Sequence, residues 1–217
     1  MQLIGMLDSP YVRRVAITLQ ELGIGFEHRS VSVFRHFDQF AAINPVVKAP
    51  TLVCDDGETL MDSTLIIDYA EALAGPKRSL MPPTTAARRD ALQRIGVALA
   101  GCEKGVQIVY ERNVRPPEKL HQPWVDRVRG QMHAALALLE AAQQRAPLAA
   151  DAGSIGQDVL TIAVVWRFLA ETLREEVKAA QYPALSMLSA RAEARASFRA
   201  APHSVETMAA QPAARHA

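Results

Sequence analysis

Ser9 and Pro10 stand between a short apolar run, residues 2–6, and a helix-like segment, residues 10–22. Serine is favoured as the cap of a helix N-terminus, and proline is favoured at the first helical position. The pair therefore predicts a helix that begins beside the end of a strand, with a hydroxyl and several free backbone N–H groups facing one point. Such a point stabilises an anion. A serine cap without a ligand is common, so Ser9 becomes a candidate only through what surrounds it.

Two further polar segments could complete a site around Ser9. Pro50 follows Ala49 at the start of a predicted strand, residues 49–54, where proline occupies an edge, a first position or a cis bend. A cis bond would leave the N–H and C=O of Ala49 free to pair with a peptide. Asp62 and Ser63 open a later helix; Ser63 can cap it, its N–H groups can bind a carboxylate, and Asp62 can accept an ammonium group. The pair suits the α-amino acid end of a ligand.

The elements that would hold these residues alternate in the first 80 residues and are helical afterwards. Apolar periodicity and turn signals predict strands and helices in the order βαβ, β-hairpin, α, with strands at 2–6, 26–33, 49–54 and 59–61. Residues 81–85 are a predicted linker, and residues 86–199 carry only helical patterns. Residues 200–217 offer little to bury and are predicted to be a flexible tail.

In this order, the polar segments resemble the glutathione transferase superfamily, most closely its bacterial members with a Ser-Pro start. The residues that carry the resemblance are Ser9-Pro10-Tyr11-Val12-Arg13-Arg14-Val15, Asn44-Pro45-x-x-Lys48-Ala49-Pro50-Thr51-Leu52, Asp62-Ser63 and Ala163-Val164-Val165-Trp166-Arg167-Phe168. The resemblance extends to about residue 199. It implies an α/β thioredoxin-like N-terminal domain (βαβ-ββα), an all-α helical C-terminal domain and a homodimer.

The resemblance also implies that glutathione is bound as a co-substrate. Its γ-glutamyl end would lie on Asp62 and Ser63, and its cysteinyl backbone would pair antiparallel with Ala49, as an added strand. Lys48, or His36 from the preceding loop, would reach the glycine carboxylate.

The sulfur of glutathione would then face Ser9, whose hydroxyl and helix N-terminus would favour the nucleophilic thiolate. Tyr11 is an alternative donor, but a residue just inside the helix is aimed less well, which favours Ser9. Tyr110 and Trp166 are candidates for an apolar electrophile pocket, although Trp166 also lies on the apolar stripe of its own helix. The neighbouring Arg13 and Arg14 are expected on a solvated helix face or in salt bridges.

Composition excludes several other classes of protein. The net charge is +1 and basic residues form no run, so nucleic-acid binding has little support. No apolar stretch is long enough for a membrane helix, and the short, interrupted first apolar run is not expected to act as a signal peptide. Cys54 and Cys102 are far apart and are expected to be free thiols in a reducing compartment, the cytoplasm. The six histidines show no metal-ligand spacing.

Three functions compete with a transferase that attacks an apolar electrophile in detoxification or catabolism. A thiol–disulfide enzyme is disfavoured because no cysteine lies near Ser9. A non-catalytic glutathione-binding or regulatory protein is separated poorly by sequence, although the intact set of polar segments favours a working site. A glutathione-dependent isomerase or dehalogenase would use the same thiolate on another electrophile. The sequence does not identify the electrophile.

Overall fold

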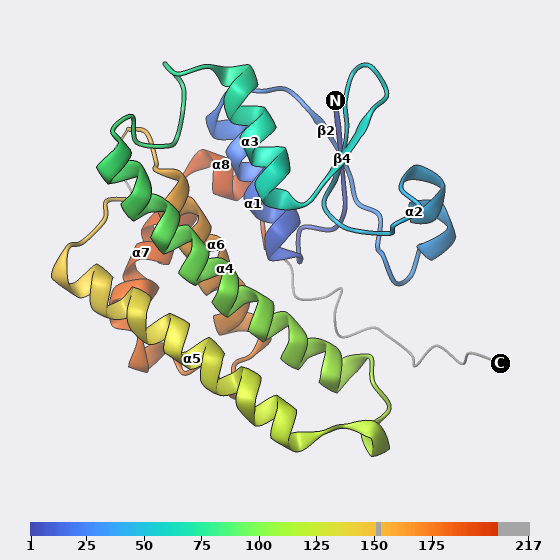
Figure 1. The fold of residues 1–217 in the computed structure, drawn as a ribbon, viewed down its shortest axis with the longest axis vertical. Coiled ribbons are helices and arrows are strands. Elements are labelled where there is room, and N and C mark those ends of the chain that lie inside the picture. Colours follow the sequence, from blue (N-terminus) through green and yellow to red (C-terminus); the bar gives the residue numbers. More distant parts are fainter. Residues whose placement is uncertain (151–152, 204–217) are drawn as a thin grey trace.

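The computed structural model describes residues 1–150 and 153–203 and divides them between a small sheet domain and a set of long helices (Figure 1). The sheet domain contains, in chain order, β1 (Gln2–Ile4), α1 (Pro10–Glu21), β2 (Glu27–Arg29), α2 (Phe37–Ile43), β3 (Thr51–Val53), β4 (Thr59–Met61) and α3 (Ser63–Ala74). The strand order is β2-β1-β3-β4, with β1 parallel to β2 and the other two pairs antiparallel. This arrangement confirms the predicted thioredoxin-like domain.

Alternation of side chains along β1 gives the sheet two apolar faces. Leu3 is buried with residues of α1 and α3, whereas the next residue, Ile4, is buried on the other side with Val31 and Phe40 of the α2 region. The second strand is shorter than the predicted 26–33, because Val31 N–H already bonds back to the carbonyl of Arg29 and the chain turns there.

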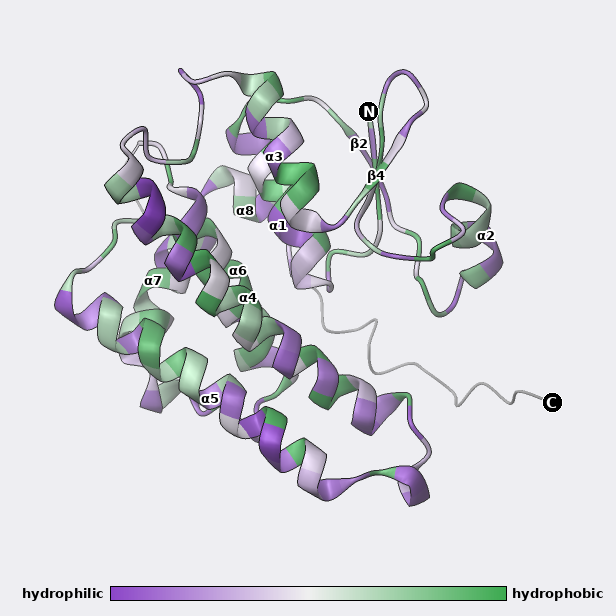
Figure 2. Ribbon diagram, viewed as in Figure 1, coloured by the Kyte–Doolittle hydropathy of each residue, from purple (hydrophilic) through white to green (hydrophobic). Residues whose placement is uncertain are grey.

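The helical part contains α4 (Thr85–Asn113), α5 (Gln122–Arg145), α6 (Gln157–Thr172), α7 (Pro183–Glu193) and the short α8 (Ala196–Ala200). Two 3-10 turns, Pro117–Lys119 and Ala179–Gln181, lie in the connections. The helix α6 packs against α1, α4 and α7, and its central turns are mostly hydrophobic in Figure 2. It is the central helix, as its apolar sequence predicted. None of the helices within residues 1–150 and 153–203 is long and apolar enough to cross a membrane.

Helix α1 joins the two parts through Arg13, which is 1% exposed. Its guanidinium donates two hydrogen bonds of 2.7 Å to the carboxylate of Glu193 and one of 2.8 Å to the carbonyl of Ala201. The expectation of a solvated helix face is therefore wrong for Arg13, whereas the salt-bridge alternative is confirmed. The guanidinium carbon of Arg13 lies over the ring of Phe198, 5.5 Å from its centroid, which adds a cation–π contact.

The predicted tail begins inside this packed region. Residues 200 to 203 are described. Ala201 is buried, and its carbonyl accepts a hydrogen bond from Arg13. The start of the tail is thus packed against the fold, contrary to the prediction of little to bury. Residues 204–217 lie outside the described residues.

Candidate functional site

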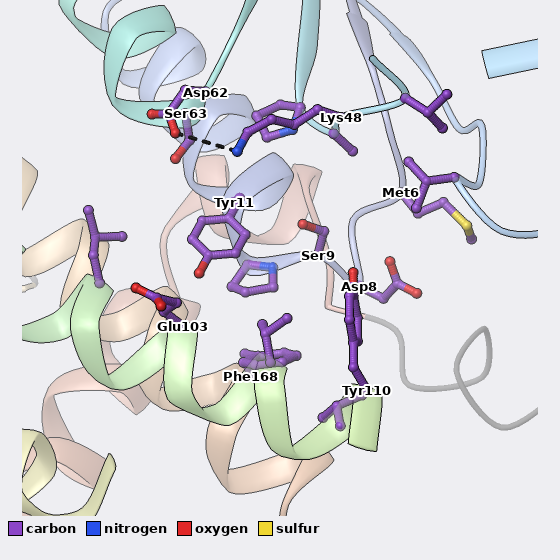
Figure 3. A pocket seen from close by; sticks show the side chains of 18 of the residues that line it. Met6, Asp8, Ser9, Tyr11, Lys48, Asp62, Ser63, Glu103, Tyr110 and Phe168 are labelled. Atoms are coloured by element: carbon purple, nitrogen blue, oxygen red, sulfur yellow. Dashed lines mark ion pairs between the residues drawn. The ribbon is translucent and has the colours of Figure 1, made fainter. Parts of the chain in front are cut away.

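A cavity of about 710 Å³ opens between the sheet domain and helices α4 and α6 (Figure 3). Most of the residues singled out in the sequence line it: Ser9, Tyr11, Lys48, Ala49, Pro50, Asp62, Ser63 and Tyr110. We call one side of it the polar end, formed by Lys48, Ala49, Asp62 and Ser63. We call the other the apolar end, formed by Phe34, Val106, Tyr110 and Phe168. Ser9 lies between the two ends in Figure 3.

Ser9 is the N-cap of α1, as predicted. Its backbone is extended, Pro10 occupies the first turn, and the N–H of Val12 donates to the Ser9 hydroxyl oxygen over 3.4 Å. That distance is long for a hydrogen bond, so the hydroxyl is only weakly engaged by its own helix. The Ser9 hydroxyl and the first N–H groups of α1 can therefore act on a negatively charged atom in the cavity.

The Ala49–Pro50 peptide bond is cis, which settles the three alternatives for the proline. The pairing of β3 with β1 starts only at Thr51, opposite Ile4. Ala49 thus stands before the ladder and beside the cavity, where its backbone can pair with an extended peptide.

Helix α3 begins with Asp62 as its N-cap, not Ser63. The carboxylate Oδ1 of Asp62 accepts a 2.9 Å hydrogen bond from the N–H of Thr64, and Asp62 has a φ of 73°. That backbone conformation brings its carboxylate over the first turn, so Ser63 is not needed as the cap. Ser63 is instead buried, and its hydroxyl accepts a 3.1 Å hydrogen bond from Arg14.

Arg14 was expected, like Arg13, on a solvated helix face or in a salt bridge, but it is buried and bonds to two hydroxyl groups. It is 1% exposed, and its Nη1 also donates to Thr64 over 3.3 Å. Burial lowers the pKa of Arg14 to about 10, so the guanidinium stays charged at neutral pH and puts a positive charge under the start of α3. The signal available was its place inside the apolar run of α1, from Val12 to Leu19.

The two candidates for binding a terminal carboxylate differ in position. Lys48 lines the polar end, where its ammonium lies 3.9 Å from the Asp62 carboxylate with both side chains about half exposed. His36 is exposed at the start of α2, does not line the cavity, and accepts a 3.3 Å hydrogen bond from the N–H of Ser32. The His36 alternative is not supported, because the tight turn after Ser32 carries Phe34 to the cavity instead.

Tyr11 points toward α4 in Figure 3, on the side of Glu103. Burial and the neighbouring Cys102 raise the pKa of the Tyr11 hydroxyl far above its ordinary value. This hydroxyl is therefore a neutral donor at all ordinary pH values, directed away from the N-terminus of α1.

The apolar end contains Tyr110 but not Trp166. Trp166 is 4% exposed and packs edge-on against Tyr182, with ring centroids 5.6 Å apart, away from the cavity lining. Tyr110 meets Phe34 edge-on at the same centroid distance of 5.6 Å. Phe34, Phe168, Glu103 and Asp8 were missed, because they come from separate segments and form no motif.

The two cysteines lie outside the lining of this cavity. Both are buried free thiols, and burial raises the pKa of Cys102 to about 12. Across residues 1–150 and 153–203, no cluster of three or more His, Cys, Asp or Glu side chains could hold a metal ion.

Comparison with known proteins begins with the sheet domain. Residues 3–78 match the family model for the glutathione S-transferase N-terminal domain. The uncharacterised GST-like protein YibF of Escherichia coli K12 is 38% identical over 73 residues, which are 34% of this chain and 36% of YibF. The aligned region is thus about a third of that relative.

Solved structures match over nearly the whole chain. A glutathione S-transferase of Methylobacterium radiotolerans, in complex with glutathione sulfonate, is 26% identical with a TM-score of 0.83, covering 94% of this chain and 95% of that one. A glutathione transferase family member of Pseudomonas fluorescens, with bound glutathione, is 27% identical with a TM-score of 0.78, covering 94% and 99%. Residues 3–78 are therefore similar to the glutathione S-transferase N-terminal domain, and the chain has the fold of the glutathione S-transferase superfamily.

Proposed function

We propose that this protein is a glutathione transferase, which binds glutathione, holds its sulfur as a thiolate and directs it at an apolar electrophile. The observation that carries the proposal is that Ser9, Ala49, Asp62 and Ser63 open onto one cavity, with an apolar end beyond Ser9. The glutathione and glutathione sulfonate bound in the Pseudomonas fluorescens and Methylobacterium radiotolerans structures support the choice of ligand.

Glutathione would lie along the polar end as an extended peptide. Its γ-glutamyl carboxylate would meet the first N–H groups of α3 and the Ser63 hydroxyl, above the buried charge of Arg14. Its ammonium would meet the Asp62 carboxylate, its cysteinyl backbone would pair with Ala49, and its glycine carboxylate would reach Lys48.

The thiol would then face Ser9. A free thiol has a pKa of about 8.5, and each unit by which that pKa falls requires about 1.36 kcal/mol of preference for the thiolate. A hydrogen bond from the Ser9 hydroxyl and the N-terminus of α1 together supply about two such units, so most of the bound glutathione is thiolate at neutral pH. The thiol proton leaves to solvent, and the sulfur electron pair forms the new bond to carbon.

Ser9 is preferred to Tyr11 as the donor. Tyr11 is half-buried beside Cys102 and turns toward α4, whereas Ser9 lies between the polar and apolar ends. A thiol–disulfide enzyme is disfavoured, because neither cysteine lines the cavity and burial raises the pKa of both.

The assembly, location and role belong to the same proposal. A homodimer is supported by exposed apolar side chains on α3, where Leu65 is 63% and Leu73 is 48% exposed. Two free buried cysteines suit the reducing cytoplasm. Detoxification or a catabolic step is the role that a thiolate and an apolar electrophile imply.

The test is ultraviolet difference absorbance of bound glutathione at thiolate wavelengths, titrated against pH. We expect a thiolate pKa about two units below that of free glutathione in the unaltered protein. The signal should shift back in Ser9→Ala while binding persists, and should be unchanged in Tyr11→Phe. Binding without thiolate formation would favour the non-catalytic alternative, and absence of binding would refute the glutathione assignment.

A further inference from the structure

Asp8 brings a carboxylate to the side of the cavity where the electrophile would lie. It directly precedes Ser9, lines the cavity and is partly buried. In Figure 3 its side chain lies beside the hydroxyl of Tyr110, and its charge raises the pKa of Tyr110 together with burial, which is the larger cause. No ion-pair or hydrogen-bond partner for the Asp8 carboxylate exists within residues 1–150 and 153–203.

The cavity lining offers little positive charge to balance Asp8. Lys48 is the one cationic side chain among the described lining residues, and it lies at the polar end beside Asp62. Glu103 of α4 adds a third carboxylate to those of Asp8 and Asp62, and it accepts hydrogen bonds from Gln107 and Lys104. Arg35 is exposed, and its guanidinium donates to the sulfur of Met6, another residue of the cavity lining, over 3.4 Å.

The aromatic rings of the apolar end also favour a positively charged group. Phe34 and Tyr110 meet edge-on across the apolar end, and Phe168 lines it from α6. The faces of such rings attract a cation, and the attraction grows when the cation loses water. Carboxylate and rings together therefore favour a positively charged group and oppose a negatively charged one.

We propose that Asp8 is a specificity-determining residue, which makes the enzyme prefer electrophiles carrying a positive charge to electrophiles carrying a negative charge. The inference rests on the proposed transferase function. For an aryl chloride the reaction is substitution: the thiolate sulfur bonds to the ring carbon, the carbon–chlorine bond breaks, and chloride leaves with the electron pair. Asp8 takes no part in these bonds and acts only on the charge that the substrate carries.

The test uses three electrophiles with one reacting ring. These are 4-chloro-3,5-dinitrobenzoate, its neutral amide, and the amide extended by a 2-(trimethylammonio)ethyl group. We expect kcat/KM relative to the neutral amide, corrected for the uncatalysed rates, to be highest for the cation and lowest for the anion. In Asp8→Asn the cation-to-anion ratio should fall about tenfold. Asp8 attracts the cation and repels the anion, and each interaction contributes about threefold when the charges lie several ångströms apart and are screened by water.

The cation-to-anion ratio of kcat/KM distinguishes an effect on substrate specificity from an effect on activation of the thiol. Any change in the thiolate pKa in Asp8→Asn affects all three electrophiles equally and cancels. Asp38→Asn makes the same change in net charge on the exposed start of α2 and should leave the ratio within twofold. Arg35→Gln should raise the ratio, because it removes a cation that contacts Met6 in the cavity lining.

A second measurement needs no variant. In the unaltered protein the ratio should fall toward one as ionic strength rises from about 0.01 to 1 M, because the screening length drops from about 30 to 3 Å. Conjugation with a ratio that neither Asp8→Asn nor salt alters would overturn the role of Asp8 alone. Absence of conjugation with all three electrophiles would overturn the proposed transferase function as well.

Discussion

The polar and apolar ends of the cavity are built in different ways. The polar end depends on backbone: the N-terminus of α3, the cis peptide before Pro50 and the free backbone of Ala49. The apolar end depends on side-chain bulk, contributed by a loop at Phe34 and by helices α4 and α6. The backbone geometry of the polar end favours particular residue types, such as proline at a cis bond and aspartate at a helix N-cap. Many apolar residues can supply the bulk of the apolar end. The polar end can therefore be recognised by a sequence motif, whereas the apolar end cannot.

Two neighbouring arginines of α1 also differ in the part of the molecule that each one supports. Arg13 and Arg14 are both 1% exposed, yet Arg13 bonds to Glu193 of the helical part and Arg14 bonds to Ser63 of the sheet domain. Helix α1 thus holds the polar end with one buried charge and the helical part with the other. The polar end and the contact with the helical part can therefore be perturbed separately through residues of the same helix.

The largest expected effect comes from breaking the support of the polar end with Gly5→Ala. Gly5 has a φ of +136°, and a Cβ there would lie 2.6 Å from Val12 and 3.1 Å from Ala49. Both the backbone strain and the overlap oppose folding, so we expect the free energy of unfolding to fall by about 3 kcal/mol in urea denaturation.

Gly25→Ala is the matched control for Gly5→Ala. A Cβ at Gly25 meets nothing within 4 Å, so its stability should change by less than about 0.5 kcal/mol. Equal effects of the two substitutions would contradict the view that β1, α1 and the Ala49 loop are locked together at Gly5.

A second, smaller effect should act on the apolar end through pH. The ring of His203 lies edge-on to Phe168, and burial, with Arg13 and Arg167, lowers its pKa to about 4. A lowered pKa means that the stabilising contribution is complete above about pH 6.5 and is lost as pH falls toward 4. We expect the free energy of unfolding to fall by about 2 kcal/mol over this range, and to fall less in His203→Gln.

Measurements of activity at low pH can show which end of the cavity is affected first. The KM for the electrophile should rise at pH 5 before the Kd for glutathione does, because Phe168 belongs to the apolar end. The exposed His121 provides a control, since His121→Gln should keep the pH dependence of the unaltered protein. If His203→Gln and the unaltered protein lose stability in parallel, His203 does not link pH to this end.

The difference between local backbone signals and contacts of distant side chains explains which features could be predicted from the sequence. The starts of helices and the strand at 59–61 were predictable because capping residues and turn signals are local. Burial of Arg14 was not, because its partner Ser63 lies 49 residues further along. Trp166 was ambiguous since α6 is buried on nearly every side, so its apolar stripe gave no direction. The position of His36 outside the cavity was not predictable either, because it depends on one turn after Ser32 that brings Phe34 to the cavity.

The smallest of these effects should separate the two arginines. Arg14→Met removes the charge beneath Ser63, and we expect the Kd for glutathione to rise about tenfold in calorimetric titration, because the γ-glutamyl carboxylate loses the attraction of a buried positive charge. The KM for the electrophile should change by less than twofold. Arg14→Lys should restore part of the affinity, because it keeps the charge but loses the shared hydrogen bonds to Ser63 and Thr64.

Arg13→Met is the matched control, since it removes an equally buried charge from the adjacent position of α1. It leaves the carboxylate of Glu193 without its guanidinium, so we expect a lower free energy of unfolding but an unchanged Kd for glutathione, measured where both variants remain folded. If Arg13→Met weakened glutathione binding as much as Arg14→Met, the effect would be a general loosening of α1. The polar end would then depend on the whole helix and not on the single charge under Ser63.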